Sequence, residues 1–195
     1  MRLFFRLRTY DLANVPKRGG LLILSNHQSF LDPMLVGCSG PRCFHFMARH
    51  TLFRNKLIRG ILMWVNAFPV ERGRADRAAI RTAIERLAAG GVVVMFPEGT
   101  RTTDGELQPM KGGFRLLVRR AKVSVLPVVV DGAFKAWPRS QKLPRPSPVS
   151  VIYGQSIPSE EFDNLSDDEA AERIQREMAA LLAELRRKRA TSCQG

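Results

Sequence analysis

Two side chains near the amino terminus, those of His27 and Asp32, could act together in proton transfer. They lie in the stretch NHQSFLD at 26–32, which directly follows the apolar run 21–24. Pro33 has the φ favoured at the first helical position and Asp32 before it is a good N-cap, so we expect a strand to end and a helix to begin here. A neutral imidazole near pH 7 can accept a proton from a hydroxyl, and a carboxylate on its other nitrogen would fix the tautomer. Taken alone, such a spacing more often belongs to a turn histidine before a helix cap, so the rest of the chain has to decide.

Three further segments place polar groups beside apolar runs, and a fourth is itself an apolar run. In chain order they are FPVER at 68–72, FPEGTR at 96–101, KGG at 111–113 and VLPVVV at 125–130. Sites in open α/β sheets gather at the carboxyl ends of strands. His27, Arg72 and Glu98 each come just after a predicted strand, so we expect these three side chains to converge.

Together with the histidine stretch, these segments resemble the blocks of the glycerolipid acyltransferase family, which includes the 1-acylglycerol-3-phosphate acyltransferases. The family's four blocks read NHxSxxD, a segment ending in arginine, FPEGTR, and an apolar strand with a central proline. Each has a counterpart here, in the same order, over residues 21–130. The resemblance implies transfer of a fatty acyl group from acyl-CoA or acyl carrier protein to the free hydroxyl of 1-acyl-glycerol 3-phosphate, giving phosphatidate. Glycerol 3-phosphate, a lyso-ornithine lipid or another lysophospholipid stay open as acceptors.

The resemblance also implies roles for single residues. His27 would be the catalytic base and Asp32 the carboxylate that orients it, while Arg72 and Arg101 would bind the acceptor's phosphate. Arginine suits that task because its paired N–H groups match phosphate oxygens. The other predicted substrate-binding residues are Glu98, Gly99, Thr100 and Lys111.

The route of the reaction follows from which nucleophile motifs the sequence contains. No G-x-S-x-G elbow is present, which favours direct attack by the acceptor over an acyl-enzyme. Ser29 is expected to hydrogen-bond within its loop. Glu98 is expected to position the site through hydrogen bonds, and Gly99 to let the backbone approach the ligand closely.

Alternating strand and helix patterns predict an α/β fold, a single-domain sandwich with a mostly parallel central sheet flanked by helices. The predicted strands are 21–25, 43–47, 66–70, 92–96, 124–130 and 148–153, and the predicted helices are 33–38, 55–65, 74–89, 113–121 and 166–188. The domain spans 1–195, with a basic and apolar segment at 1–18, the blocks over 21–130 and a C-terminal helix at 166–189. The apolar stripe of helix 55–65 is expected to be mostly core. Met63 and Trp64 lie off that stripe and could reach a bilayer or an acyl chain.

Charge is concentrated in the first 150 residues, which carry 25 Lys or Arg and 9 Asp or Glu, whereas the last 45 carry 6 and 9. A basic body attracts nucleic acid, an anionic bilayer or phosphorylated substrates. A nucleic-acid-binding domain is disfavoured because aromatic residues are few and not interleaved with the basic ones. Three cysteines without C-x-x-C spacing argue against a disulfide framework and a structural zinc site. We expect no metal and no cofactor.

Membrane contact is expected at the amino terminus. No run of about eighteen apolar residues exists, so no transmembrane helix is expected. The apolar residues Leu3, Phe4, Phe5 and Leu7 alternate with Arg2, Arg6 and Arg8, a pattern suited to an anionic surface. The basic run 186–189 could add to this contact, or it could simply complement the helix dipole. These features predict a cytoplasmic protein, peripheral on the inner face of the cell membrane.

Overall fold

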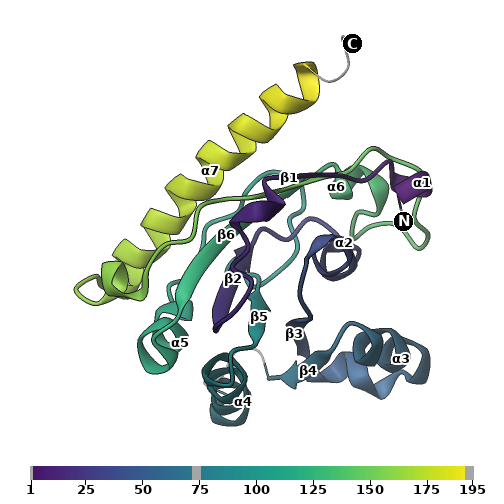
Figure 1. Cartoon of the computed structure of the whole chain (residues 1–195). Helices are drawn as coiled ribbons and strands as arrows, with labels where there is room; N and C mark the ends of the chain where they lie inside the picture. Colours follow the sequence, from purple (N-terminus) through teal and green to yellow (C-terminus); the bar gives the residue numbers. More distant parts are fainter. Residues whose placement is uncertain (1, 72–75, 192–195) are drawn as a thin grey trace.

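The computed structural model describes residues 2–71 and 76–191 of the chain, and its centre is a seven-stranded sheet (Figure 1). The strands are β1 (Arg8–Tyr10), β2 (Leu21–Ser25), β3 (Phe44–Arg49), β4 (Ala67–Val70), β5 (Val92–Met95), β6 (Ser124–Asp131) and β7 (Ser150–Tyr153). Their order across the sheet is β1-β7-β6-β2-β5-β3-β4. Strands β6 and β7 run antiparallel, and the other neighbouring pairs of described strands are parallel, which confirms the predicted α/β class.

Helices cover both faces of this sheet because the side chains of its central strands are apolar on both sides. The helices are α1 (Arg2–Phe5), α2 (Asp32–Ser39), α3 (Lys56–Trp64), α4 (Arg77–Ala88), α5 (Phe114–Ala121), α6 (Ala133–Ala136) and α7 (Asp167–Thr191). Leu21 and Ile23 of β2 face a core shared with α1, α2 and α6. Leu22 and Leu24 face the other core, which α4, α5 and α7 close. The result is a three-layer sandwich.

Helix α7 begins as the sequence predicts. The backbone N–H of Ser166 donates to Glu169 Oε2 at 2.7 Å, and the backbone N–H of Glu169 donates to Ser166 Oγ at 3.2 Å. This reciprocal pair is a capping box. At the other end of α7, the basic run is engaged within the fold: Lys188 contacts Asp11 at 2.6 Å, and Arg189 contacts Asp131. The run therefore binds the protein's own carboxylates, in addition to complementing the helix dipole.

The N-terminal segment is partly built into the fold, so not all of the apolar side chains predicted to insert into a membrane are available for insertion. Residues 8–10 form β1, which pairs with β7, and the backbone N–H of Val149 donates to the Phe5 carbonyl at 2.9 Å. The Phe5 side chain is buried in the core, and Leu7 packs against that core. Of the predicted inserting residues with a described side chain, Phe4 remains exposed. The side chain of Leu3 lies outside the described part.

Helix α3 departs from its predicted burial. Its N-cap is Asn55, whose side chain accepts from the backbone N–H groups of Leu57 and Ile58. Of the predicted apolar stripe, Val65 just after the helix is buried and Leu62 packs against the core, but Leu57 and Ile61 are exposed. The reason is position: α3 packs beside the edge strand β4, and among the described residues no further layer covers its outer side.

Helix α2 begins one residue earlier than expected. The sequence predicts Asp32 as its N-cap, but Leu31 occupies that position and Asp32 is the first helical residue, followed by Pro33. The Asp32 side chain makes no cap hydrogen bond to this helix and is instead used by the preceding loop. The predicted start of α4 at 74 lies outside the described residues; in the described part Asp76 caps α4 by accepting from the Ala79 N–H.

Candidate active site

The motif segments 26–32 and 96–101 meet because β2 and β5 are parallel neighbours. Leu24 of β2 pairs with Met95 of β5, so the residues after each strand emerge side by side at the same edge of the sheet. The backbone N–H of Thr102 donates to the His27 carbonyl at 2.8 Å and ties the two segments together. The predicted convergence of His27 and Glu98 at the carboxyl ends of strands is therefore confirmed.

His27 and Asp32 form the pair that their spacing predicts. His27 Nδ1 lies 2.8 Å from Asp32 Oδ2, and the histidine side chain keeps 12 % of its surface exposed while the carboxylate has none. The same Asp32 oxygen accepts the backbone N–H of Ser29 at 2.7 Å. Because Nδ1 faces the carboxylate, the neutral ring carries its proton there and leaves Nε2 as the basic nitrogen.

Phe96 fixes the plane of the histidine ring. The two rings stack with centroids 4.2 Å apart and an interplanar angle of 20°. Phe96 is the first residue after β5 and is almost fully buried, so it supplies a rigid surface for the imidazole. The ring is thus held on one side by a carboxylate and on its face by an aromatic side chain.

Glu98 lies in the buried interior of the site, with 4 % of its surface exposed. Burial raises the pKa of its carboxyl to about 8, and the nearby carboxylates of Asp32 and Asp104 push the pKa in the same direction. The backbone N–H groups of His27 and Gln108 oppose this shift in part. A proton is therefore held next to the His27–Asp32 pair near neutral pH.

The turn after β5 needs a glycine at position 99. Gly99 has φ +73°, in the left-handed region, and its N–H donates to the Phe96 carbonyl at 3.0 Å. The backbone N–H of Lys111 donates to the Pro97 carbonyl at 3.0 Å, and its ammonium lies within 3.4 Å of where a Cβ on Gly99 would stand. Lys111 therefore packs against the turn 96–99 that contains Glu98.

Arg101 completes the described cationic part of the site. Its guanidinium carbon lies 3.6 Å from the centroid of the Phe30 ring, which belongs to the histidine segment. Thr100 sits beside it in the same turn and is exposed. Arg72, the other predicted phosphate ligand, lies outside the described residues. The structure thus brings His27, Asp32, Glu98 and Arg101 together, with Lys111 against Gly99.

Ser29 hydrogen-bonds within its loop, as predicted. Its hydroxyl donates to the Trp137 carbonyl at 2.8 Å and accepts the Leu31 N–H at 3.2 Å. The residue is fully buried. Both interactions anchor the loop between β2 and α2.

Two positioning residues, Asn26 and Gln28, were not predicted from the sequence. Asn26 donates to the Val130 carbonyl at 2.9 Å and accepts the Val130 N–H at 2.8 Å, so it joins the ends of β2 and β6. Gln28 donates to the Gly105 carbonyl at 2.7 Å and accepts the Phe134 N–H at 3.3 Å. Both are nearly fully buried amides on either side of His27. A polar residue in a strand-to-helix turn can bind backbone groups that are far away in the sequence. The sequence contains no signal for which groups these are.

His45 has its side-chain partner away from this site. His45 lies near the start of β3, at the opposite end of the sheet, and its Nδ1 is 2.8 Å from the Arg86 guanidinium. Burial and that guanidinium lower its pKa. Within residues 2–71 and 76–191, no group of three or more His, Cys, Asp or Glu is placed to hold a metal ion, and no helix is long and apolar enough to cross a membrane.

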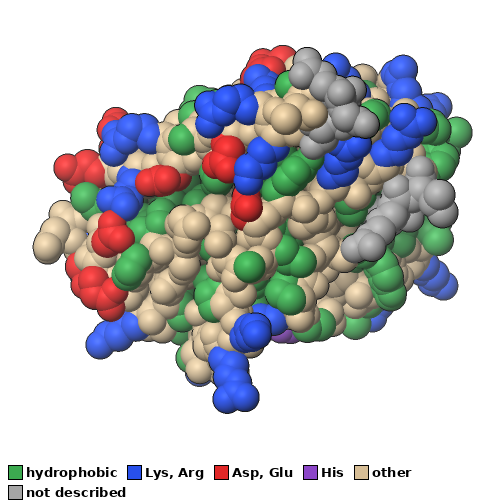
Figure 2. All heavy atoms as spheres, turned by 45° about the horizontal axis from the view of Figure 1, so that its top comes forward, with side chains coloured by type: hydrophobic (Ala, Val, Ile, Leu, Met, Phe, Trp, Pro, Cys, Tyr) green, Lys and Arg blue, Asp and Glu red, His purple; other side chains and the backbone are tan. Residues whose placement is uncertain are grey.

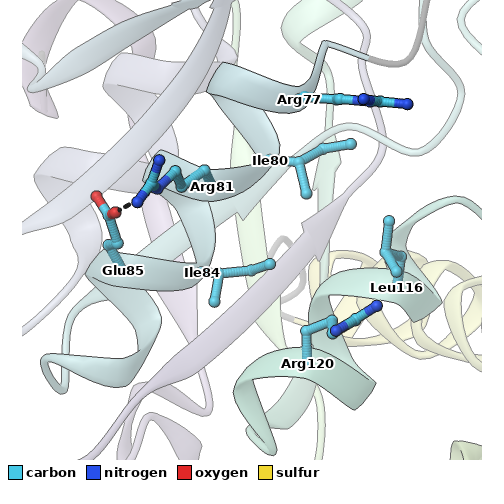
Figure 3. A pocket seen from close by; sticks show the side chains of 7 residues that line it. All are labelled: Arg77, Ile80, Arg81, Ile84, Glu85, Leu116 and Arg120. Atoms are coloured by element: carbon cyan, nitrogen blue, oxygen red, sulfur yellow. Dashed lines mark hydrogen bonds and ion pairs between the residues drawn. The ribbon is translucent and has the colours of Figure 1, made fainter.

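A surface groove of about 560 Å³ lies between α4 and α5, away from these side chains. Figure 3 shows its lining: Arg77, Ile80, Arg81, Ile84, Glu85, Leu116 and Arg120. Arg81 and Glu85 pair with each other at 3.1 Å. None of these residues belongs to a motif segment, and α4 and α5 cover the sheet face opposite α2. The groove is therefore separate from the histidine site.

Comparison with known proteins agrees with the motif segments. The family model described as acyltransferase matches residues 6–131. A 1-acyl-sn-glycerol-3-phosphate acyltransferase of Bacillus subtilis is 30 % identical over 84 % of this chain and 79 % of its own length. The chloroplastic protein of that name from Arabidopsis thaliana is 29 % identical over 85 % of this chain, and the match spans about half (47 %) of its length.

The fold has a solved counterpart as well. The crystal structure of the 1-acyl-sn-glycerophosphate acyltransferase PlsC from Thermotoga maritima superposes with a TM-score of 0.76, at 23 % identity, over 92 % of this chain and 72 % of that one. At that identity the likeness shows the fold alone. The family model and the bacterial relative go further: the chain belongs to the PlsC-type acyltransferase family and is an acyltransferase.

Proposed function

We propose that this protein transfers a fatty acyl group from acyl-CoA or acyl carrier protein to the free hydroxyl of 1-acyl-glycerol 3-phosphate, giving phosphatidate. The observation that carries the proposal is the contact between His27 Nδ1 and the buried Asp32, which leaves the basic ring nitrogen Nε2 for the substrate. The names of the bacterial and plant relatives support this acceptor. The protein would act at the inner face of the cell membrane, where such an acceptor resides.

The chemistry needs one base and no covalent enzyme intermediate. The acceptor hydroxyl oxygen attacks the thioester carbonyl carbon while its proton passes to His27 Nε2. Asp32 stabilises the imidazolium that forms. The tetrahedral intermediate then collapses, the carbon–sulfur bond breaks, and the leaving thiolate takes the proton from the imidazolium. The ester and the free thiol are the products.

The cations of the site would bind the acceptor's phosphate. The guanidinium of Arg101 lies against Phe30, directly beside the histidine segment, and Lys111 is folded onto the neighbouring turn. Arg72 would join them as the second phosphate ligand. An arginine fork matched to phosphate oxygens also sets the distance between the phosphate and the reacting hydroxyl.

A screen of acceptors and donors tests the proposal. Labelled acyl-CoA and labelled acyl carrier protein are each offered with 1-acyl-glycerol 3-phosphate, glycerol 3-phosphate and a neutral-headgroup lysophospholipid, and the lipid products are identified. We expect phosphatidate from the first acceptor, and a loss of about 10²- to 10⁴-fold in His27→Ala. Product from another acceptor alone would refute the substrate assignment. Turnover of His27→Ala within tenfold of the wild type would refute the mechanism.

A further inference from the structure

Exposed large apolar side chains gather on one side of this molecule. In the described part of the chain there are eight of them: Phe4, Phe30, Leu57, Ile61, Met63, Trp64, Leu116 and Leu143. Seven belong to α1, the loop before α2, helix α3 and the loop 137–148, which lie together at the right of Figure 1. Only Leu116 lies on α5, on the opposite face of the sheet. We call the first group of elements the apolar side.

Direct contacts join parts of the apolar side into one surface. The rings of Phe30 and Trp137 have centroids 5.6 Å apart, so the loop before α2 touches the loop 137–148. The end of that loop bonds to α1 through the Val149 N–H and the Phe5 carbonyl. Helix α3 is attached separately, through Leu62, which packs against the same core as α2. The fold therefore holds each of these elements in place.

The sequence segments that build the apolar side contain no acidic residue. Residues 2–10, 33–70 and 132–158 hold eighteen Lys or Arg in all, and no Asp or Glu; residues 26–31, which include Phe30, hold none of the four types. Figure 2 agrees: at the end of the molecule that carries α1, apolar and basic side chains are in view, whereas the acidic ones in view lie over the other half. Apolar side chains ringed by positive charge complement an anionic lipid surface.

Helix α3 has the geometry of an element that lies in a membrane interface. Leu57, Ile61 and Trp64 are spaced four and three residues apart, so they form one stripe along the helix. Their exposed fractions are 78 %, 46 % and 68 %. Lys56 is exposed on the flank of this stripe, and Arg59 is exposed farther round the helix. Lys56 can reach lipid phosphates while the stripe enters the acyl region.

We propose that the apolar side docks on an anionic bilayer, with the stripe Leu57, Ile61 and Trp64 of α3 inserted into it. This inference deepens the proposed function, in which the acceptor is a membrane lipid. It also places the site at the interface: Phe30 is 43 % exposed on the apolar side and carries Arg101 on its ring. An acceptor could then present its headgroup to His27 while its acyl chain stays in the bilayer.

Vesicle binding of the intact chain, measured without any substrate, tests the docking. The vesicles contain phosphatidylglycerol and phosphatidylcholine, and a second set contains phosphatidylcholine alone. The variant Leu57→Ser/Trp64→Ser should bind anionic vesicles at least about tenfold more weakly than the wild type. Leu57→Ser alone should weaken binding in part, and Leu116→Ser is its control, since it removes an exposed leucine from the opposite face and should bind like the wild type.

Tryptophan emission reports on the insertion itself. Anionic vesicles should shift the wild-type emission to the blue, and Trp64→Phe should lose most of that shift although Trp137 remains. Added salt should weaken binding of the wild type. Equal vesicle binding by the double variant and the wild type would overturn the proposal. The proposal would also be overturned if the wild type formed a dimer without lipid and the double variant lost that dimer but still bound vesicles. The stripe would then contact a second copy of the chain. Neither result bears on the proposed acyl transfer, which the acceptor and donor screen tests separately.

Discussion

Asp32 has two partners that a helix cap would not have. It holds His27 Nδ1 at 2.8 Å and the Ser29 N–H at 2.7 Å through one oxygen, and it is fully buried. The second contact fixes the carboxylate independently of the histidine. The pair is therefore preorganised before substrate binds, which is what a base oriented by a carboxylate requires.

We expect Asp32→Asn to lower kcat by about 10²- to 10⁴-fold, because an amide neither fixes the imidazole tautomer nor stabilises the imidazolium. Circular dichroism should show an intact fold, since the amide has nearly the same shape. Ser29→Ala is the comparison: it removes the hydroxyl bonded to Trp137 and Leu31. That change should cost about 1 kcal/mol of unfolding free energy and spare turnover. A Ser29→Ala enzyme that folds but is as inactive as Asp32→Asn would contradict direct attack and point to Ser29 as a nucleophile.

Arg101→Ala should raise the KM for the acceptor by about 10- to 100-fold, because one charge-assisted contact to phosphate is worth about 1.5–3 kcal/mol. Arg101→Lys should recover only part of the loss, since a lysine cannot make the forked contact. Steady-state kinetics with each substrate varied in turn separates the effects. A raised KM for the donor with an unchanged acceptor KM would reassign Arg101 to the phosphates of the donor.

Glu98 should make stability depend on pH. Its carboxyl has a pKa of about 8 in the folded protein and its ordinary value of 4.5 in the unfolded chain. Between those values the folded state binds more protons, so the stabilisation is complete below the lower pKa and is lost as the pH rises toward 8. The unfolding free energy should fall by up to about 1.4 kcal/mol per pH unit in this window. Glu98→Gln should lack that slope in urea titrations; parallel curves for the two proteins would contradict the raised pKa.

At the scale of the elements, the site depends on the ends of three neighbouring strands. Strand β2 lies between β5 and β6, and Asn26 at its end bonds both backbone groups of Val130 in β6. His27 is the next residue. The sheet thus determines the position of His27, because Asn26 fixes the end of β2 against β6.

Asn26→Ala should lower the free energy of unfolding by about 2–4 kcal/mol, since it leaves a buried N–H and a buried C=O of Val130 without their partner. Asn55→Ala, which removes the N-cap of α3, should cost about 1 kcal/mol and leave the site in place. Urea unfolding of both variants, followed by activity in native buffer, measures the difference. Equal losses of unfolding free energy in the two variants would contradict the role of Asn26 in joining the ends of β2 and β6.

The elements that could be predicted are those whose signal is local. Strands β2, β5 and β6 are predicted by their consecutive apolar runs, and the start of α7 is predicted by its capping box. Each of these signals lies within a few consecutive residues. Strand β1 could not be predicted, because Arg8–Tyr10 is three residues long and takes its stability from pairing with β7. The stripe of α3 shows which residues are apolar, but not whether another layer covers them. Likewise the sequence pairs His27 with Asp32, whereas the burial of Glu98 and the partners of Asn26 depend on the assembled sheet.

For the whole molecule, the N-terminal segment and the last turn of α7 meet beside the edge strand β1. Phe5 is buried and β1 closes one edge of the sheet, while Lys188 near the end of α7 contacts Asp11 just after β1. The amino-terminal segment therefore has a structural role in addition to any contact with lipid. Its removal would alter the fold and membrane binding together.

A chain lacking residues 1–10 should lose about 2–4 kcal/mol of unfolding free energy, because it gives up the buried Phe5 side chain and the pairing of β1 with β7. It should also self-associate, since β7 would become an exposed edge strand. Phe4→Ser, which changes an exposed side chain of α1, should keep the stability and monomeric state of the wild type. Urea unfolding and sedimentation velocity compare the three proteins. A truncated chain as stable and as monomeric as Phe4→Ser would show that the segment is only an appendage, and vesicle binding by the truncated chain could then be read as a direct measure of lipid contact.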